Sequence, residues 1–276
     1  MAVRVEDVRK VYRIGKISVN ALRGVNMEIT KGEVVAIMGP SGSGKSSLLN
    51  LIGTLDQPTE GKVYVDETDI SEVSERERTQ LRRHKIGFIF QFYNLIPVLT
   101  AYENVELPMV IAGKPKQGMN TRIEHLLEMV GLTDRAHHRP DELSGGEQQR
   151  VAIVRALATA PSILLADEPT GDLDTKTASE VMRYLLESSK QENVTVILVT
   201  HDPNVAKMAS RIFRMQDGVI KDTVTNHSVR NPDNEEHQLL DKLEQTQTEA
   251  VQTYTHELMK INKQIADIRA ALDFSV

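Results

Sequence analysis

Two stretches of the sequence have the composition of a phosphate-binding helix start. Residues 39–46 read GPSGSGKS, and residues 143–150 read LSGGEQQR. Each places small residues before a segment whose apolar spacing predicts a helix. The first backbone N–H groups of a helix lack partners within it, and the helix dipole is positive there, so such a start can hold an anion. The sequence therefore raises the question of why one chain carries two.

The first stretch fits the pattern G-x-x-x-x-G-K-[S/T] and lies between the apolar runs VVAIM and SLLNLI. This order of strand, loop and helix is the context that a phosphate loop requires, and it disfavours a plain glycine-rich turn. Backbone N–H groups would surround phosphate oxygens, Lys45 would reach the β and γ phosphates, and Ser46 would bind Mg²⁺. The residues predicted to bind phosphate are Gly39, Ser41, Gly42, Ser43, Gly44, Lys45, Ser46 and Ser47.

Four further polar residues end apolar runs that are predicted to be strands. Asp167 and Glu168 end ILLADE, His201 follows VTVILVT, and Gln91 follows FIF. Asp167 is placed to bind Mg²⁺, and Glu168 to polarise an attacking water. In an open α/β sheet, His201 at its strand end would face the ligand crevice and donate to phosphate. Gln91 has an amide that could touch Mg²⁺ or the water. Each would be a solvated or structural side chain if it stood alone, and the phosphate loop favours the catalytic interpretation.

The segments around these residues alternate between strand-like and helix-like patterns. Residues 1–36 indicate short strands, 61–93 strands around a polar helix, and 100–136 helices. From residue 144 the pattern runs helix, strand, helix, strand, helix and a closing hairpin. This alternation predicts an α/β core with parallel strands.

The last part of the chain has a different composition. Residues 223–236 are polar and turn-rich, which predicts a linker, and 237–273 are predicted to form an amphipathic helix. It could form a coiled coil with a second copy or with a helix of a membrane partner, or it could fold back on its own domain. We favour the first alternative slightly. The heptad-like apolar stripe consists of Val251, Tyr254, Leu258, Ile261, Ile265, Ile268 and Leu272.

The composition narrows the function classes. The net charge is −6, from 33 basic and 39 acidic residues, and this gives no support to nucleic-acid binding. The chain has no Cys, which excludes disulfides and Cys-based metal sites. We expect no secretory signal, and the longest apolar runs fall short of the about 20 residues that cross a bilayer. We therefore expect any membrane role to come through a partner.

Taken together and in order, the motifs resemble the ATP-binding-cassette (ABC) ATPases from residue 1 to about 222. They are Tyr12, the phosphate loop, Gln91, LSGGE, ILLADE, GDLD and THD. The resemblance implies a P-loop ATPase core with an antiparallel β subdomain and a helical subdomain over about 92–150. It also implies a head-to-tail homodimer around two ATP molecules. The LSGGE signature (Ser144, Gly145, Gly146, Glu147) of one chain would close on the ATP held by the other chain, which explains the second phosphate-binding helix start.

The same resemblance assigns further roles. Tyr12 would stack on adenine, Asp174 of GDLD would line the dimer seam, Gln91 would couple to the membrane partner, and His201 would be the switch histidine. The family usually has Ser-Ala-Leu-Asp where this chain has Gly171 and Asp172 in the first two places, a departure that affects the seam more than the chemistry. Because Glu168 is intact, we expect ATP hydrolysis.

Three longer stretches are similar to the macrolide-efflux and lipoprotein-releasing ATPases, the MacB and LolD group. They are IGFIFQFYNLIPVLTAYENVELP, HHRPDELSGGEQQRVAIVRAL and LADEPTGDLD. The similarity implies a permease of few transmembrane helices with a large external domain, and a peripheral position on the cytoplasmic face of the inner membrane. The candidate permease contacts, of which about half could instead be core, are Phe92, Tyr93, Leu95, Ile96 and Leu99.

Two other functions compete with this interpretation. A soluble ABC ATPase could act on DNA or the ribosome without a permease. The chain has one cassette and only a short segment between Gln91 and Ser144, which argues against that class, as does the absence of a basic excess. A regulatory module could hold ATP without hydrolysing it, but the intact Glu168 and His201 argue against that.

Overall fold

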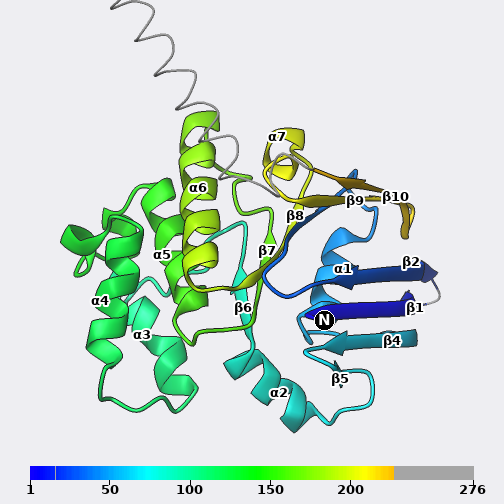
Figure 1. The fold of residues 1–276 in the computed structure, drawn as a ribbon, viewed down its shortest axis with the longest axis horizontal. Helices are drawn as coiled ribbons and strands as arrows, with labels where there is room; N and C mark the ends of the chain where they lie inside the picture. Colours follow the sequence, from blue (N-terminus) through cyan, green and yellow to red (C-terminus); the bar gives the residue numbers. More distant parts are fainter. Residues whose placement is uncertain (16, 227–276) are drawn as a thin grey trace, which may run out of the picture. The chain divides into compact units, whose positions relative to one another are not determined.

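A six-stranded sheet with the order β10-β9-β3-β8-β7-β6 forms the centre of the fold (Figure 1). The computed structural model describes residues 1–15 and 17–226. Within this sheet β9, β3, β8, β7 and β6 pair in parallel, and β10 pairs antiparallel to β9. The strands are β3 (Val34–Met38), β6 (Ile86–Ile89), β7 (Ile163–Asp167), β8 (Thr195–Thr200), β9 (Arg211–Gln216) and β10 (Val219–Thr225).

The central strands read as continuous apolar runs because both of their faces are buried. All six residues of β8 are buried. Alternate side chains enter different hydrophobic cores: Val196 and Leu198 pack on one face of the sheet, and Ile197 and Val199 on the other. The sheet therefore separates two layers.

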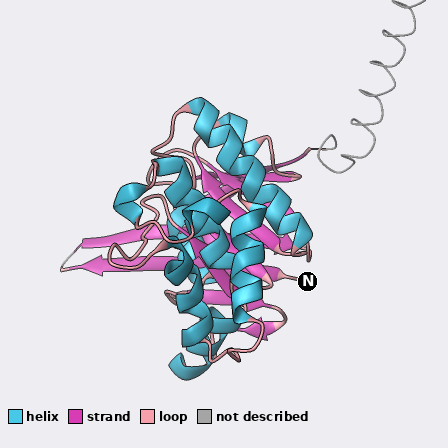
Figure 2. Cartoon of the chain, turned by 90° about the vertical axis from the view of Figure 1, so that its left-hand side faces the viewer, coloured by secondary structure: helices cyan, strands magenta, loops and turns pink. Residues whose placement is uncertain are grey.

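On one face lies a second, antiparallel sheet with the order β2-β1-β4-β5. Its strands are β1 (Val3–Ile14), β2 (Ile17–Ile29), β4 (Glu60–Val65) and β5 (Thr68–Asp69). Helix α1 (Lys45–Ile52) contacts both sheets, and its Leu48 and Leu51 share a core with Val5, Val63 and Ile37. Strands β1 and β2 form a long hairpin that projects from the rest of the fold (Figure 2).

The other face is covered by helices (Figure 1). A bidentate ion pair joins two of them: the guanidinium of Arg122 donates to both oxygens of Glu192 at 2.7 and 2.6 Å, and also to the carbonyl of Leu157 at 3.0 Å. The helices of this layer are α3 (Ala101–Ile111), α4 (Met119–Met129), α5 (Gly145–Leu157) and α6 (Thr175–Gln191), with the short 3₁₀ turns Thr133–Arg135 and Pro140–Glu142. Helices α2 (Glu75–His84) and α7 (Pro203–Ala206) complete the fold.

A buried asparagine fixes the loop that follows β6. Asn104 of α3 accepts a hydrogen bond from Ile96 N at 2.8 Å. Its amide donates to the carbonyls of Ile96, Leu99 and Thr100 at 3.2, 3.1 and 2.9 Å. Because buried polar groups are costly when unpaired, this network holds residues 96–100 in one conformation.

The predicted α/β fold class is confirmed, with its antiparallel β layer and its helical layer. One boundary differs: β10 continues to Thr225, which pairs with Arg211, so the folded unit extends past the predicted domain end at 222. The predicted helix at 237–273 and most of the predicted linker lie outside the described residues. Among the residues that the structure describes, none of the helices combines the length and apolarity needed to cross a bilayer.

Candidate active site

The predicted catalytic residues follow three neighbouring strands of the central sheet. The phosphate loop follows β3, Asp167 ends β7, and His201 follows β8. The strand order places β8 between β3 and β7, and the pairs Met38–Thr200 and Asp167–Val199 bring the carboxyl ends into register. Parallel pairing therefore gathers these side chains at one edge of the sheet.

Two glycines of the phosphate loop, Gly39 and Gly44, are required by close packing. A Cβ at Gly39 would overlap the carbonyl of Met215, and one at Gly44 would lie 2.5 Å from the carbonyl of Ala21. Gly44 also has φ +99° as the residue before α1, a conformation that glycine adopts without strain. At Gly42, by contrast, a Cβ would meet no described atom within 4 Å. The loop is therefore closely packed against neighbouring backbone at its two ends, and its middle has free space beside it.

Lys45 points its ammonium into the loop rather than into solvent. The side chain is 8% exposed, and Nζ donates to the carbonyls of Gly39 at 2.8 Å and Pro40 at 3.0 Å. The next residue, Ser46, donates from Oγ to Oδ1 of Asp167 at 3.2 Å. Two of the predicted Mg²⁺ ligands are therefore in contact. Burial, together with the neighbouring charge of Glu168, raises the pKa of Asp167 despite the hydrogen bond from Ser46.

Glu168 and His201 are also brought together. Nδ1 of His201 lies 3.0 and 2.9 Å from the two carboxylate oxygens of Glu168. Since a carboxylate only accepts, Nδ1 carries the proton and Nε2 is left for another partner. Glu168 has φ +48°, which is uncommon for a residue with a side chain, and its backbone N donates to the carbonyl of Val199 at 2.9 Å. This strained turn directs the chain away from the strand immediately after Asp167.

Tyr12 lies in a polar network on the second sheet. Its hydroxyl donates to Asp56 at 2.9 Å, and Lys10 Nζ donates to the same carboxylate at 2.6 Å and lies 4.9 Å from the centre of the tyrosine ring. Burial and the Asp56 carboxylate raise the pKa of Tyr12. Burial acts to raise the pKa of Asp56, but hydrogen bonds from Lys10 and Gln57 N outweigh it and lower that pKa. Asp56 therefore fixes the hydroxyl of Tyr12, and Lys10 covers one face of its ring.

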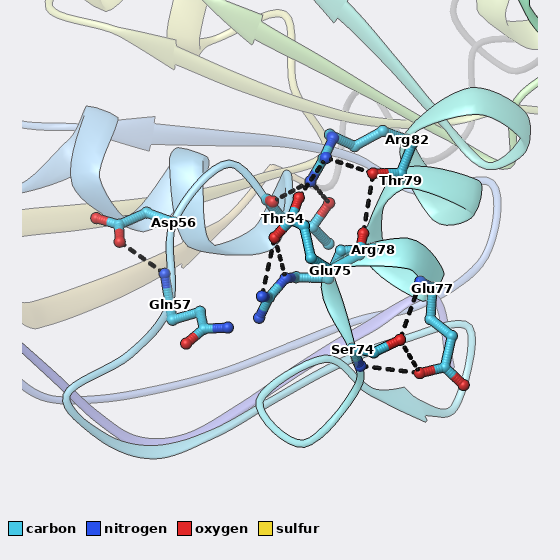
Figure 3. Close-up of polar contacts among 9 residues, drawn as sticks. All are labelled: Thr54, Asp56, Gln57, Ser74, Glu75, Glu77, Arg78, Thr79 and Arg82. Carbon is cyan, nitrogen blue, oxygen red and sulfur yellow. Dashed lines mark hydrogen bonds and ion pairs between the residues drawn. The ribbon is translucent and has the colours of Figure 1, made fainter.

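The segment that carries Asp56 is braced by α2 (Figure 3). Arg82 donates to the carbonyl of Thr54 at 2.7 Å and to Glu75 at 2.8 Å. Helix α2 itself begins with a capping box between Ser74 and Glu77. Because Thr54 follows α1, which begins at Lys45, Asp56 ties the tyrosine to the helix of the phosphate loop. Sequence reasoning missed Lys10 and Asp56; only the spacing of Lys10 and Tyr12 on one strand face could have indicated the first.

The second predicted phosphate-binding start is a capped helix N-terminus. Ser144 precedes α5 and accepts from Glu147 N at 3.3 Å, while Glu147 accepts from Ser144 N at 2.8 Å. The backbone hydrogen bond from Ser144 lowers the pKa of Glu147. Gly146 leaves no room for a side chain, because a Cβ there would lie 2.6 Å from Thr177 Cγ2. Over the described residues, no hydrogen bond or ion pair joins residues 144–147 to the phosphate loop.

Gln91, which follows β6, contacts the segment between β7 and α6, and Asp174 is the last residue of that segment. Gln91 Nε2 donates to Asp172 at 3.4 Å, and Asp174 caps α6 by accepting from Thr177 N at 3.1 Å. A Cβ on Gly171 would lie 3.1 Å from Gln91 Nε2, so the departure noted at Gly171 leaves room for that amide. Neither Gln91 nor Asp174 bonds to the phosphate loop within the described part of the chain.

Comparison with known proteins settles the family. Residues 22–171 match the family described as ABC transporter. The chain belongs to the ABC transporter family. An uncharacterized ABC transporter ATP-binding protein of Thermotoga maritima is 52% identical over 215 residues, covering 78% of this chain and 92% of that protein. The macrolide export protein MacB of Syntrophobacter fumaroxidans is 48% identical over 79% of this chain, which spans 31% of MacB.

Among solved structures, the ABC cassette MJ0796, described as a dimer in a post-hydrolysis state with ADP and Pi, has a TM-score of 0.75 and 46% identity. The match covers 82% of this chain and 99% of the MJ0796 chain. This ABC protein is thus an ATP-binding and ATP-hydrolysing member of the family, as its motifs predicted. The predicted resemblance to macrolide-export ATPases is also confirmed.

We expect the Asp56→Ala variant to bind ATP about fivefold more weakly, because Tyr12 loses a hydrogen bond worth about 1 kcal/mol. Its affinity for inorganic tripolyphosphate, which has no base, should not change. Equilibrium binding of the two ligands, with Asp222→Ala as an exposed acidic control, measures both. Equal weakening of tripolyphosphate binding would show that Asp56 supports the phosphate loop and not the tyrosine.

Proposed function

We propose that the chain works as a homodimer around two ATP molecules and drives an integral membrane permease of the macrolide-efflux or lipoprotein-releasing kind. One observation carries the proposal. The phosphate loop, Asp167, Glu168 and His201 are assembled at one sheet edge, while a second phosphate-binding start at Ser144 makes no hydrogen bond or ion pair with the phosphate loop in the described part of the same chain. A second copy would supply that start to complete the site.

In this proposal the phosphate loop binds the triphosphate through its backbone N–H groups. Lys45, now bonded to the carbonyls of Gly39 and Pro40, would turn to the β and γ phosphates. The open middle of the loop at Gly42 gives the phosphates space. Tyr12, held by Asp56 and Lys10, would stack on the adenine ring.

The residues at the loop also fit Mg²⁺. Ser46 and Asp167 present oxygen ligands 3.2 Å apart, the kind that Mg²⁺ prefers. Mg²⁺ usually keeps several waters and takes only one or two protein oxygens together with substrate phosphates, so these two ligands would be enough. When bound, Mg²⁺ would neutralise charge on the β and γ phosphates. Gln91 would have to leave Asp172 to reach the ion or the water.

Hydrolysis rests on Glu168 and His201. Glu168 would orient the attacking water and accept its proton. His201 holds both carboxylate oxygens through Nδ1, and an N–H at Nε2 would donate to the γ-phosphate at the same time. The pair therefore sets the position of the water against the phosphate, and catalysis of this type is mainly positioning and charge stabilisation.

The second chain would contribute Ser144, Gly145 and Gly146 to the γ-phosphate, and Asp174 to the seam. The capping box pairs the N–H of Glu147 with Ser144 and leaves the N–H groups of Gly145 and Gly146 at the positive helix end for a phosphate. Glu147 is occupied by this box, so we infer that it shapes the helix start and does not touch ATP itself. The dimeric MJ0796 cassette with ADP and Pi supports this arrangement.

The permease would bind beside the loop that follows Gln91. A groove of about 380 Å³ is lined by apolar side chains that include Phe88, Leu107 and Ile111, and by the basic side chains of Arg82 and Arg83. This combination suits an amphipathic helix with acidic side chains. The neighbouring apolar side chains that are exposed are Phe92, Ile96, Val98 and Val110.

The predicted permease contacts divide between surface and interior. Phe92 is 72% exposed and Ile96 is at the surface, whereas Tyr93, Leu95 and Leu99 are partly buried. Val98, 73% exposed, was missed. Binding at this surface would place the chain on the cytoplasmic face of the membrane through its partner.

Replacing Glu168 by Gln should lower the ATPase rate by about 10²–10⁴-fold, because the water loses its proton acceptor. ATP binding should persist, and sedimentation with Mg-ATP should show a stable dimer. The exposed Glu187→Gln serves as the matched control. Turnover of Glu168→Gln at the wild-type rate would contradict the assignment of the base.

A photo-reactive amino acid at position 92 or 111 should crosslink the chain to an integral membrane protein in the membranes of its host. The same photo-reactive amino acid in place of Lys221 should not crosslink to it, because Lys221 lies in β10, the outermost strand on the side of the central sheet away from β6. Mass spectrometry of the crosslinked bands identifies the partner. Crosslinks from positions 92 and 111 to ribosomal or DNA-associated proteins would favour the soluble alternative and rule out the permease.

A further inference from the structure

One buried side chain connects the two phosphate-binding regions of the chain. Gln149 lies in α5, five residues after Ser144, and is 0% exposed. Its Nε2 donates to the carbonyl of Pro169 at 2.6 Å. Pro169 directly follows Glu168. A single hydrogen bond therefore joins the helix that begins at the signature to the turn that carries the predicted base.

That turn needs an external support. Glu168 has φ +48°, and such a conformation persists only where surrounding contacts impose it. Within the turn, Gly171 N donates to the carbonyl of Glu168 at 3.1 Å. Proline has no N–H, so the carbonyl is the only backbone hydrogen-bonding group of Pro169, and Gln149 takes it. The amide thus holds the chain immediately after the strained residue.

The other half of the amide shows that packing alone does not account for a glutamine at this position. Oε1 of Gln149 is buried and has no hydrogen-bond partner among the described residues. A buried unpaired acceptor costs free energy that an apolar side chain of the same size would avoid. Packing alone would favour methionine or leucine at this position. The donor to Pro169 is what the amide adds.

Helix α5 is a rigid connection between the two ends. Five residues of α-helix span about 7.5 Å, and the start of α5 is packed on α6 where Gly146 meets Thr177. A displacement of Ser144 therefore moves Gln149 with it. Because parts of a packed interior do not deform independently, the displacement reaches Pro169.

We propose that Gln149 is a positioning residue that couples the two ATP sites of the dimer. It sets Glu168 of its own chain according to whether the signature of that chain has engaged the ATP bound to the second chain. The inference rests on the proposed dimer and on Glu168 as the base. ATP at one site would thereby prepare the base at the other, a coupling between distinct sites.

The first test compares Gln149→Met with the wild type. Methionine keeps the length of the side chain and removes both the donor and the unpaired oxygen. We expect kcat to fall about ten- to hundredfold, because the base is misplaced, with KM for ATP little changed. The Hill coefficient for ATP should fall toward one, and Tm should stay level or rise. A lower Tm with unchanged kcat would overturn the proposal, and Gln191→Met, at an exposed position, is the control.

Mixed dimers decide where Gln149 acts. Pairing a wild-type chain with a Glu168→Gln chain leaves one site able to hydrolyse ATP. Gln149→Met in the chain that keeps Glu168 should slow that site. The same change in the Glu168→Gln chain, whose signature serves the intact site, should leave the hydrolysis rate of that site unchanged. Slowing only in the second arrangement, or equally in both, would overturn the proposal.

Two measurements separate failure of this inference from failure of the proposed function. Activity of the Glu168→Gln homodimer would remove Glu168 as the base whatever Gln149 does. A mixed dimer without the Gln149 change must show turnover from its single intact site. If both behave as expected and the Gln149 arrangements do not differ, the coupling role alone is wrong.

Discussion

The parallel pairing of β3, β8 and β7 is the constraint on which the rest of the structure depends. Both faces of these strands are buried, so their register is fixed by two hydrophobic cores at once. That register brings Met38, Asp167 and Thr200 to one edge, and the residues that follow them form the site. A slip of one residue would exchange the faces of every side chain and separate Ser46 from Asp167.

Around this edge, three layers each supply one part of the proposed ATP site. The central sheet supplies the phosphate loop, the carboxylates and the histidine. The antiparallel sheet supplies Tyr12, which Asp56 ties to the end of α1. The helical layer supplies the capped start of α5, which in the proposed dimer would serve the ATP of the second chain. Arg122 and Glu192 join α4 to the end of α6, so a bidentate ion pair holds two helices of this layer together.

Features that depend on local chemistry could be predicted from the sequence, and those that depend on distant packing could not. The phosphate loop, the two carboxylates and the signature were found because their residues are contiguous. The order of strands and helices followed from apolar spacing. The contacts of Lys10 with Asp56 and of Gln149 with Pro169 join residues 46 and 20 positions apart, and no pattern marks them.

Surface and interior were also hard to separate by residue type alone. Val98 and Val110 are apolar and exposed, while Leu95 in the same region is partly buried.

Glu147 was predicted to contact the nucleotide as part of its motif. The structure places its carboxylate in a capping box, a role that its spacing of three from Ser144 also permits.

The central claim is that each ATP lies between the phosphate loop of one chain and the signature of another. Mixing a Lys45→Ala chain with a Ser144→Arg chain tests it most directly. Each variant alone has two defective sites and should be inactive. In the mixed dimer, one site combines the intact loop of the Ser144→Arg chain with the intact signature of the Lys45→Ala chain, so ATPase activity should return. No recovery at any mixing ratio would mean that each chain uses its own signature, and would contradict the account.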